Sequence, residues 1–547
     1  KFEPSTGRLI PTQPEDYLAV NHLWNAKDKT ISLVAAKNEF VAFQVAFRGQ
    51  VKNVKATLQW KAPSKITSSF ATYRHVFAKG GQLPDPLVTL TGDFSVPSTD
   101  ETIEKQSVGC MYVDLFIPAE TPAGLHQADL ILTSGDEKLT LPLTLKVWDF
   151  ALPNKLSFLA EMNGYGLPAS EYGYYRVAHK HRTVLNIVPY SQRGEVSEGW
   201  APNWNGVALD FRKWENRFGQ YFNGSAFDDL PRKGVPLECY YLPLHENWPT
   251  PINAHYNGSY WADECFTPEY RKNFVEVSKQ LAEHFAERKW HGTLFQCFLN
   301  NKVDYKRNGW SRASAPWLLD EPASFQDFFA LRYFAQAFQE GAKPVKGEAK
   351  VVFRADISRP MWQRDSLAGL LGYNVVNNDF RRYRRMVLDR KRQHNELVIE
   401  YGSANAIESS NLQAVAWSLD AWSLGADGLL PWQTIGTRDA WSKAEATSLF
   451  YPAIRGEGEP TPSIRLKAFR RGQQDAEYLT LLSAKLKEPR WSIGQQVRET
   501  LKLAAKREGT GAVGEDAGVL TYDKLRPQDV WALRVQLGDA LQSLNTK

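Results

Sequence analysis

Eight short apolar runs, spread over residues 158–432, constrain the fold more than any other feature of this sequence. Segments of helical character separate most of them, so strands and helices should alternate along this part of the chain. Such alternation predicts a parallel sheet, either doubly wound or closed into a (β/α)₈ barrel, and the number of runs favours the barrel. The runs are FLAEMN, LNIVPY, LECYYLPL, TLFQCFLN, KVVFRA, YNVVN, ELVIEY and GLLPW.

Two of the segments between these runs have features of their own. The segment FQDFFALRYFAQAFQEG follows Ser324, carries Asp327 three residues later and ends at Gly341, a pattern that predicts a capped helix. Residues 191–235 are long for a connection between a strand and a helix. We expect them to form a lid or rim of the barrel.

The regions on either side of the repeats have different patterns. Up to about residue 153, alternating stretches such as NEFVAFQVAFRG are separated by Pro/Gly turns, which predicts a β-sandwich. Residues 484–547 contain two amphipathic helical segments. The predicted architecture is therefore multidomain, with an N-terminal all-β sandwich (1–153), a central (β/α)₈ barrel (154–483) and a C-terminal helical extension (484–547).

Composition excludes several classes of protein. Of the 547 residues, 43% are apolar and 23% are charged, as in a soluble globular protein with two or three domains. The net charge of +5 does not by itself indicate a nucleic-acid partner. No apolar run reaches the roughly 18 residues that a membrane span needs. The 18 tryptophans slightly favour a carbohydrate ligand, because aromatic faces bind sugar rings, although tryptophan is also common in cores.

The cysteines and the first residues bear on the compartment. Cys110, Cys239, Cys265 and Cys297 are too few for a disulfide scaffold and lack the spacing of a metal site. Cys239 and Cys265 could pair in an exported protein, but free buried thiols are favoured. The sequence begins KFEPSTGRLI, without methionine or an apolar signal core, which suggests an engineered start or a mature form whose leader is absent. We expect a secreted or periplasmic protein.

The active site of such a barrel lies at the C-terminal ends of its strands. The residues that follow the runs are hydrogen-bonding and aromatic groups, without a metal cluster, a glycine-rich phosphate loop or a Ser/His signature, so we expect neither metal nor cofactor. Such a ring suits a carbohydrate hydrolase, although core packing, helix capping and internal ion pairs are alternatives for its members. The candidate substrate-binding residues are Tyr190, Asn300, Arg354, Asp356, Tyr401, Trp432 and Gln433.

The stretch WLLDEPAS places two carboxylates, Asp320 and Glu321, at the point between the end of a predicted strand and the start of the next helix. Neighbouring side chains in a strand point to opposite faces, but this constraint ends where the chain leaves the sheet. Pro322 disfavours helical geometry at Glu321 and stops the strand from continuing. Both carboxyls can then project into the barrel mouth. The alternative is that the two carboxylates have no catalytic role and lie at the N-terminus of the next helix, where the helix dipole favours acidic residues.

Several segments are similar to those of a known family. FQCFLNNK followed by WLLDEP, then YGSAN, GADGLLPWQTIG and PSIRLKAFRRGQQDAEYLTLL, resemble the catalytic region of glycoside hydrolase family 123 and the related bacterial domain of unknown function 4091. AAKNEFVAFQ and PAGLHQADLIL resemble its N-terminal sandwich. The resemblance covers most of the chain, residues 1 to about 490. The Asp-Glu-Pro tripeptide alone is a weak signal, and its place after the fourth strand makes it more specific.

The resemblance implies an exo-acting β-N-acetylgalactosaminidase that retains configuration through substrate assistance. Glu321 would be the general acid/base, and Asp320 would polarise and orient the 2-acetamido group. The amide oxygen of the substrate would attack the anomeric carbon, so that an oxazolinium intermediate replaces a glycosyl-enzyme. This chemistry requires Glu321 to hold a proton near neutral pH and Asp320 to stay charged.

Two rival interpretations stay open at this point. A conventional retaining glycosidase would use Glu321 as acid/base and Glu400, near the end of the seventh strand, as nucleophile, with no acetamido group required. A non-catalytic carbohydrate-binding protein would have no need of adjacent carboxylates. In each case the partner is an oligosaccharide or glycoconjugate, and the sugar, its linkage, the aglycone and the oligomeric state are not fixed by the sequence.

Overall fold

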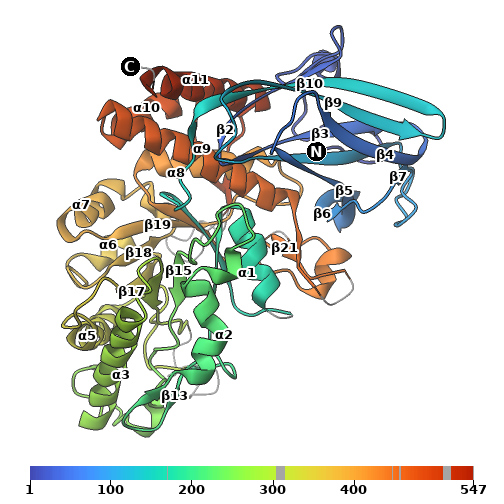
Figure 1. The fold of residues 1–547 in the computed structure, drawn as a ribbon. Coiled ribbons are helices and arrows are strands. Elements are labelled where there is room, and N and C mark those ends of the chain that lie inside the picture. The colour runs from blue at the N-terminus through green and yellow to red at the C-terminus, as the bar shows by residue number, and fades with distance from the viewer. Residues whose placement is uncertain are drawn as a thin grey trace.

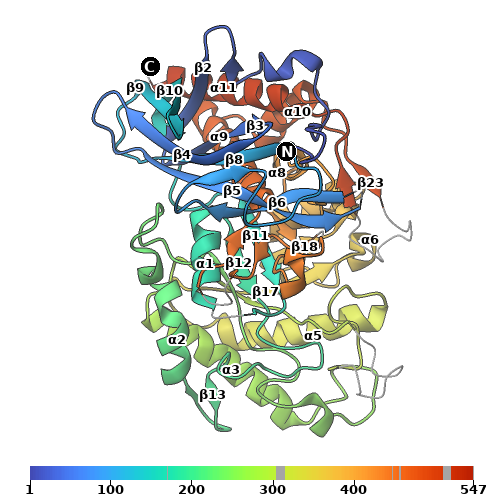
Figure 2. The same ribbon diagram turned by 90° about the vertical axis from the view of Figure 1, so that its right-hand side faces the viewer.

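The computed structural model has three parts, which Figures 1 and 2 show from two sides. A β-sandwich, coloured blue to cyan, and the C-terminal helices, in red, lie together on one side of a central barrel. The predicted multidomain architecture is thereby confirmed. The structure describes residues 1–79, 81–168, 171–302, 314–445, 447–454, 458–508 and 519–545, without the side chains of residues 378, 507 and 508.

The sandwich consists of two sheets whose alternate residues face each other. Leu33, Val113, Leu130 and Leu145 are buried between the sheets, which explains the alternating pattern of the sequence. One sheet has six strands in the order β1 (Trp24–Asn25), β2 (Thr30–Lys37), β10 (Glu137–Ala151), β9 (Gly124–Ser134), β4 (Val51–Trp60) and β7 (Phe94–Val96). The other has four, in the order β3 (Glu39–Arg48), β8 (Val108–Ile117), β5 (Thr67–Ala78) and β6 (Gly81–Thr89).

The barrel is an eight-stranded sheet, and each predicted apolar run supplies one of its strands. Neighbouring strands pair in parallel from β12 round to β15. Between β12 and β15 the Tyr241 N–H donates to Asn186 Oδ1 at 2.8 Å, so a side chain bridges the two ends of the sheet. In sheet order the strands are β12 (Val184–Ile187), β11 (Leu159–Gly164), β20 (Gly428–Pro431), β19 (Leu397–Gly402), β18 (Tyr373–Val376), β17 (Lys350–Ile357), β16 (Leu294–Cys297) and β15 (Cys239–Tyr241).

Helices follow the strands and cover the outside of the barrel (Figure 1). The predicted capped helix is α5, where the Ser324 side chain and Asp327 form a capping box. The helices that accompany the barrel are α1 (Glu171–Lys180), α2 (Arg212–Phe222), α3 (Pro268–Glu287), α5 (Phe325–Ala342), α6 (Pro360–Gln363), α7 (Arg384–His394), α8 (Leu412–Leu424) and α9 (Ile464–Leu486).

The prediction for residues 191–235 is only partly right. The segment contains the short strands β13 (Asn203–Trp204) and β14 (Leu209–Asp210), followed by α2. Helix α2 is one of the barrel helices, because Trp214 and Phe222 are buried against Tyr240 of β15. A lid or rim was expected because the segment is long for a connection between a strand and a helix, and α2 indeed begins well after the end of β12.

The C-terminal part contains α10 (Arg490–Thr500), the hairpin of β23 (Lys506–Glu508) and β24 (Val519–Thr521), and α11 (Pro527–Asn545). Helix α11 packs on the sandwich as well as on the barrel helix α9, since Asp539 accepts hydrogen bonds from Lys146 Nζ at 2.6 Å and Trp148 Nε1 at 2.8 Å. Helix α9 runs to Leu486, past the predicted boundary at residue 483. Residues 509–518 and 546–547 of the predicted extension lie outside the described residues.

Buried ion pairs join the sandwich to α9. Arg470 donates to both carboxylate oxygens of Asp114 on β8, at 2.9 and 2.6 Å, and Lys467 adds a third contact at 2.8 Å. Arg465 contacts Asp85 on β6 in the same way, at 2.9 and 2.7 Å. The conspicuous arginines of the α9 sequence therefore fix the orientation of the sandwich relative to the barrel.

All four cysteines are free, so the favoured expectation for Cys239 and Cys265 is confirmed and their disulfide is not formed. Short strands β21 (Phe450–Tyr451) and β22 (Thr461–Pro462) pair in the connection between β20 and α9. In the described part of the chain, none of the helices has the length and apolar character to cross a membrane.

Candidate active site

A cavity of about 150 Å³ opens at the C-terminal ends of the barrel strands, and both carboxylates of the Asp-Glu pair line it. The backbone around the pair explains how two adjacent side chains reach the same cavity. The N–H groups of Leu319 and Asp320 both donate to the carbonyl oxygen of Asn301, at 3.0 and 2.8 Å. The cavity is lined by Asn163, Tyr165, Phe298, Lys302, Asp320, Glu321, Arg354, Asp356, Tyr401, Leu430 and Trp432.

Glu321 has a φ of +62°, in the left-handed region that residues with a side chain rarely adopt. This conformation turns the chain, so that the side chain of Glu321 does not point away from that of Asp320 as it would in a strand. The Glu321 N–H donates to the carbonyl oxygen of Asp356 at the end of β17, at 3.1 Å. A strained backbone conformation held by its neighbours is typical of functional sites.

Lys302 bridges the two carboxyls. Its Nζ lies 2.9 Å from Glu321 Oε2 and 3.5 Å from Asp320 Oδ2. The Tyr401 hydroxyl donates a short hydrogen bond to the other oxygen of Glu321. Asp320 raises the pKa of Lys302 above its usual range, and Glu321 adds to the effect, so the ammonium stays charged. Both oxygens of Glu321 thus accept a hydrogen bond, one from an ammonium and one from a hydroxyl.

Asp320 is the more buried of the two, with 4% of its side-chain surface exposed. Burial raises the pKa of Asp320 to about 8, with a further increase from Glu321 and a partial decrease from Lys302. Without substrate, the neutral form of Asp320 is therefore favoured near neutral pH. This differs from the expectation of a charged Asp320, because the sequence does not show how deeply the residue is buried.

Arg354 and Asp356 anchor the floor of the cavity. The Arg354 guanidinium contacts both oxygens of Asp356, at 2.7 and 2.8 Å, and also donates to Glu161 at 2.8 Å and to Gln296 at 3.0 Å. The internal ion pair considered as an alternative is thus present. Both residues line the cavity as well, so the network holds the Asp356 carboxylate in a fixed position that a sugar hydroxyl can reach.

A solved structure shares this architecture from end to end. The structure of a family 123 glycoside hydrolase from Clostridium perfringens, studied for glycolipid glycan hydrolysis, matches with a TM-score of 0.61. The match covers 98% of this chain and 96% of that chain, at 12% sequence identity. The chain shares its fold with a family 123 glycoside hydrolase. The predicted resemblance is confirmed at the level of the fold.

Other matches are weaker. An endo-β-1,4-mannanase from Thermotoga petrophila matches with a TM-score of 0.33 and 10% identity, over 59% of this chain and 77% of that one. A β-glucuronidase from Parabacteroides merdae matches with a TM-score of 0.30 and 11% identity, over 80% of this chain and 52% of that one. The sequence matches no family model and no curated protein. Its relation to the bacterial domain of unknown function 4091 stays a prediction.

Within this family 123 fold, six of the nine residues predicted for the site line the cavity. Trp432 is 44% exposed at the end of β20 and meets Tyr165 edge-on, with ring centroids 6.2 Å apart. Tyr401 also lines the cavity, and its hydroxyl donates to Glu321. The six are Asp320, Glu321, Arg354, Asp356, Tyr401 and Trp432.

Three predicted substrate-binding residues lie outside the cavity. Asn300 is fully buried, and its amide has no hydrogen-bond partner in the described part of the chain. Tyr190 is buried against His245, with ring centroids 3.8 Å apart, and donates to the carbonyl oxygen of Phe298. Gln433 Nε2 donates to the Ile435 carbonyl oxygen at 3.4 Å. These side chains follow strand ends, where the chain no longer alternates, so their direction could not be predicted.

The alternative role of Glu400 as a nucleophile is wrong for this structure. Glu400 is fully buried on the outer face of β19, where its carboxylate accepts from Trp417 Nε1 of α8 at 3.0 Å and pairs with Arg381 at 2.9 Å. It does not line the cavity. The next residue, Tyr401, faces inward, as the alternation of side chains along a strand requires.

The prediction missed five cavity residues. Asn163 is the last residue of its run and Lys302 lies two residues beyond its own, so both were recognisable as members of the polar ring. Tyr165 lies two residues beyond Asn163, a spacing that places side chains on the same side of an extended chain. Phe298 and Leu430 are apolar and were indistinguishable in sequence from the barrel core.

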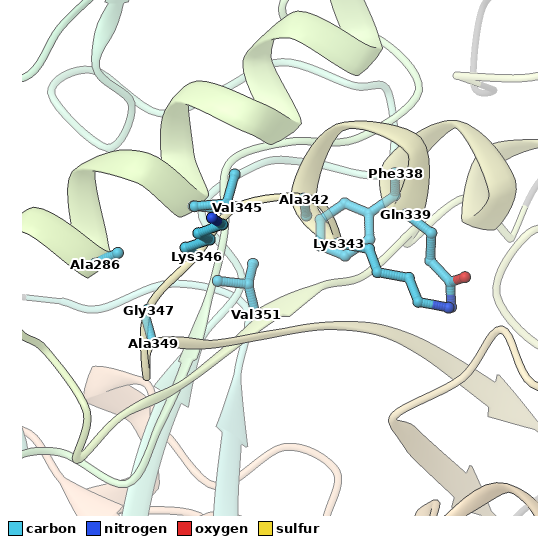
Figure 3. A pocket seen from close by; sticks show the side chains of 11 residues that line it. Ala286, Phe338, Gln339, Ala342, Lys343, Val345, Lys346, Gly347, Ala349 and Val351 are labelled. Atoms are coloured by element: carbon cyan, nitrogen blue, oxygen red, sulfur yellow. The ribbon is translucent and has the colours of Figure 1, made fainter.

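Two other cavities carry no such chemistry. One, of about 240 Å³, lies between the C-terminal ends of α3 and α5 and the start of β17, where Figure 3 shows Lys343 and Lys346 among mostly apolar residues. The other, of about 750 Å³, lies between the N-terminal segment, β3 and α9. The described residues that line them include no aspartate or glutamate. Among the described residues there is also no cluster of three His, Cys, Asp or Glu arranged to hold a metal ion.

Proposed function

We propose that this chain is a glycoside hydrolase that removes a terminal 2-acetamido sugar, namely β-linked N-acetylgalactosamine, with retention of configuration. The observation that supports this proposal most strongly is that the adjacent residues Asp320 and Glu321 both line one cavity at the C-terminal ends of the barrel strands. A conventional retaining enzyme needs a second carboxyl about 5–5.5 Å from the acid, aimed at the anomeric carbon from the other face. Glu400 does not occupy such a position.

The remaining carboxylate of the cavity is poorly suited to be a nucleophile. Among the described residues that line the cavity, Asp356 is the third carboxylate, and Arg354 occupies both of its oxygens. A carboxylate held in this way is better suited to bind a hydroxyl than to attack carbon. The nucleophile is therefore supplied by the substrate, through the oxygen of its acetamido group.

In the first step, the amide oxygen forms a bond to the anomeric carbon as the glycosidic C–O bond breaks. Glu321 gives its proton to the departing oxygen. Asp320 accepts the acetamido N–H and balances the positive charge that develops on the resulting oxazolinium ring. In the second step, Glu321 removes a proton from water, the water oxygen bonds to the anomeric carbon, and the ring opens to restore the acetamido group.

This cycle needs a proton on Glu321 and a charged Asp320, whereas the neutral form of Asp320 is favoured without substrate. Substrate binding reverses the preference through hydrogen bonds. The acetamido N–H donates to Asp320 and stabilises its charged form, while the glycosidic oxygen accepts from Glu321 and requires its neutral form. A pair that shares one proton can make this change without exchanging a proton with solvent.

The aromatic side chains of the cavity fit the same substrate. Trp432 and Tyr165 meet edge-on at the open side of the cavity, where one ring can cover the acetamido methyl or the sugar ring. The preference for N-acetylgalactosamine rests on the resemblance of the sequence to family 123. The substrate is an oligosaccharide or glycoconjugate, and we propose that the protein acts outside the cytoplasm, in a secreted or periplasmic form.

Hydrolysis of paired aryl β-glycosides tests this function. The wild type should cleave the 2-acetamido-2-deoxygalactoside and leave the plain galactoside intact. Asp320→Asn and Glu321→Gln should each lower kcat/KM for the acetamido substrate by about 10²–10⁴-fold. Efficient cleavage of the plain galactoside would refute substrate assistance. The absence of turnover with either substrate would favour a carbohydrate-binding protein.

A further inference from the structure

An arginine and a tryptophan lie beside Glu321, just outside the cavity. Arg359 follows β17, and its Nη1 donates to the carbonyl oxygen of Glu321 at 3.1 Å and to Ser358 Oγ at 3.0 Å. Its guanidinium lies 5.4 Å from the ring centroid of Trp362, on α6. Neither residue lines the cavity, so the two together form part of the rim next to Glu321.

Both side chains have surface available for a ligand. Trp362 is 49% exposed, although one of its faces is covered by the arginine. Arg359 has no carboxylate partner in the described part of the chain, in contrast to Arg354 within β17 and Arg381 after β18, which pair with acids. The remaining N–H groups of Arg359 can therefore donate to oxygen atoms that approach the rim.

The backbone holds this part of the rim in a defined position. Helix α6 starts with Pro360, and the residue after it, Arg364, has a φ of +43° and a ψ of −128°. Residues with a side chain rarely adopt this conformation, which must be maintained by its surroundings. The Arg364 carbonyl oxygen accepts from Arg390 Nη1 at 2.8 Å, and Arg390 is itself buried. Trp362 is thus presented to solvent by a fixed turn.

We propose that Trp362 and Arg359 form the subsite for the leaving group, and that this leaving group is a sugar. The inference rests on the proposed function. If the terminal sugar fills the cavity and Glu321 protonates the glycosidic oxygen, the aglycone extends past Glu321 onto the rim. The ring of the first leaving sugar then stacks on the open face of Trp362, and Arg359 donates to its oxygen atoms.

The test compares two substrates that differ only in the leaving group. One is the disaccharide of β-N-acetylgalactosamine linked 1→4 to galactose, and the other is methyl 2-acetamido-2-deoxy-β-galactoside, whose methanol cannot reach Trp362. The measured quantity is the ratio of kcat/KM for the disaccharide to that for the methyl glycoside. Trp362→Ala should lower this ratio about tenfold or more, and Trp362→Phe should restore most of it.

Trp491→Ala provides the matched control, because Trp491 is an exposed tryptophan of α10, away from the barrel mouth, and this change should leave the ratio unaltered. The proposal is overturned if Trp362→Ala lowers kcat/KM equally for both substrates or changes it for neither. If the wild type cleaves neither substrate, the proposed function fails, and calorimetric binding of the same two glycosides decides the subsite. Tighter binding of the disaccharide that is lost in Trp362→Ala would support it, and equal binding would refute it.

Discussion

Glu400 and Tyr401 are consecutive residues of β19, and their side chains lie on opposite faces of the barrel wall. Tyr401 points inward and donates to Glu321, whereas Glu400 points outward and pairs with Arg381 beneath α8. Burial raises the pKa of Glu400 to about 7, against the opposing effect of Arg381. The perturbed carboxyl therefore belongs to the packing between strand and helix and has no access to substrate.

Glu400→Gln should accordingly leave the chemistry almost unchanged and weaken the fold. The amide can still accept from Trp417, but Arg381 loses one of its two acidic partners, so we expect a loss of about 1–3 kcal/mol in the free energy of unfolding. Kinetic assays and urea denaturation of the same preparation measure the two effects. A loss of kcat as large as that of Glu321→Gln, with normal stability, would indicate that Glu400 takes part in catalysis.

Lys302→Met should move the pH–activity profile. The ammonium of Lys302 lowers the pKa of Asp320, so its removal raises that pKa further and shifts the alkaline limb upward by about one pH unit. Lys302→Arg retains the charge and is the matched control, with a limb close to that of the wild type. A lysine that only supports the fold would lower kcat in the methionine variant without moving the limb.

Asp320→Asn should stabilise the protein while it lowers its activity. The folded state raises the pKa of Asp320 from 3.8 to about 8, so the unfolded chain releases the proton at a lower pH and stability declines as pH rises between these values. The asparagine variant does not titrate in this range, so its stability does not decline in this way. We expect a gain of about 1–4 kcal/mol at pH 8 that vanishes near pH 4, measured by thermal unfolding at both pH values. Asp136→Asn, at an exposed turn, should show no such trend.

Asp114→Asn should uncouple the sandwich from the barrel. Burial alone would raise the pKa of Asp114, but Arg470 and Lys467 outweigh burial and lower it to about 2. Its stabilising effect is therefore complete above about pH 4 and is lost as pH falls through 2. At neutral pH the variant leaves two buried cations without their carboxylate, at a cost of about 3–5 kcal/mol.

Asp149→Asn is the control, because the Lys37–Asp149 pair joins neighbouring strands of the sandwich at its surface and should contribute less than about 1 kcal/mol. Differential scanning calorimetry of both variants makes the comparison. Equal small shifts in Tm would mean that the Asp114 cluster contributes no more than a surface pair.

Sequence patterns predicted the barrel well because its strands are buried on both faces. Each run of β-branched and aromatic residues had to be a strand, and the capping box at Ser324 and Asp327 fixed the start of α5. The Asp320–Glu321 pair was also recognisable, since Pro322 marks the point where the strand alternation ends. Local chemistry was sufficient in these places, because the residues that determine the structure are neighbours in the chain.

Side-chain direction after the strand ends was not predictable in the same way. Asn300 and Lys302 follow the same strand, yet Asn300 is buried outside the cavity and Lys302 reaches both carboxyls. The φ of +62° at Glu321 and the depth of Asp320 depend on contacts with distant segments, such as the hydrogen bond from Glu321 to Asp356. The burial of Asp320 favours its neutral form, whereas the sequence alone led us to expect a charged Asp320.

The central claim, that the substrate supplies its own nucleophile, is tested most directly with a series of aryl 2-acetamido-2-deoxy-β-galactosides. Replacement of the acetyl hydrogens by one, two and three fluorine atoms makes the amide oxygen a progressively weaker nucleophile without altering the leaving group. We predict that kcat/KM of the wild type falls steeply with each fluorine. A rate that stays constant along the series would contradict substrate assistance and place the nucleophile on the protein or on water.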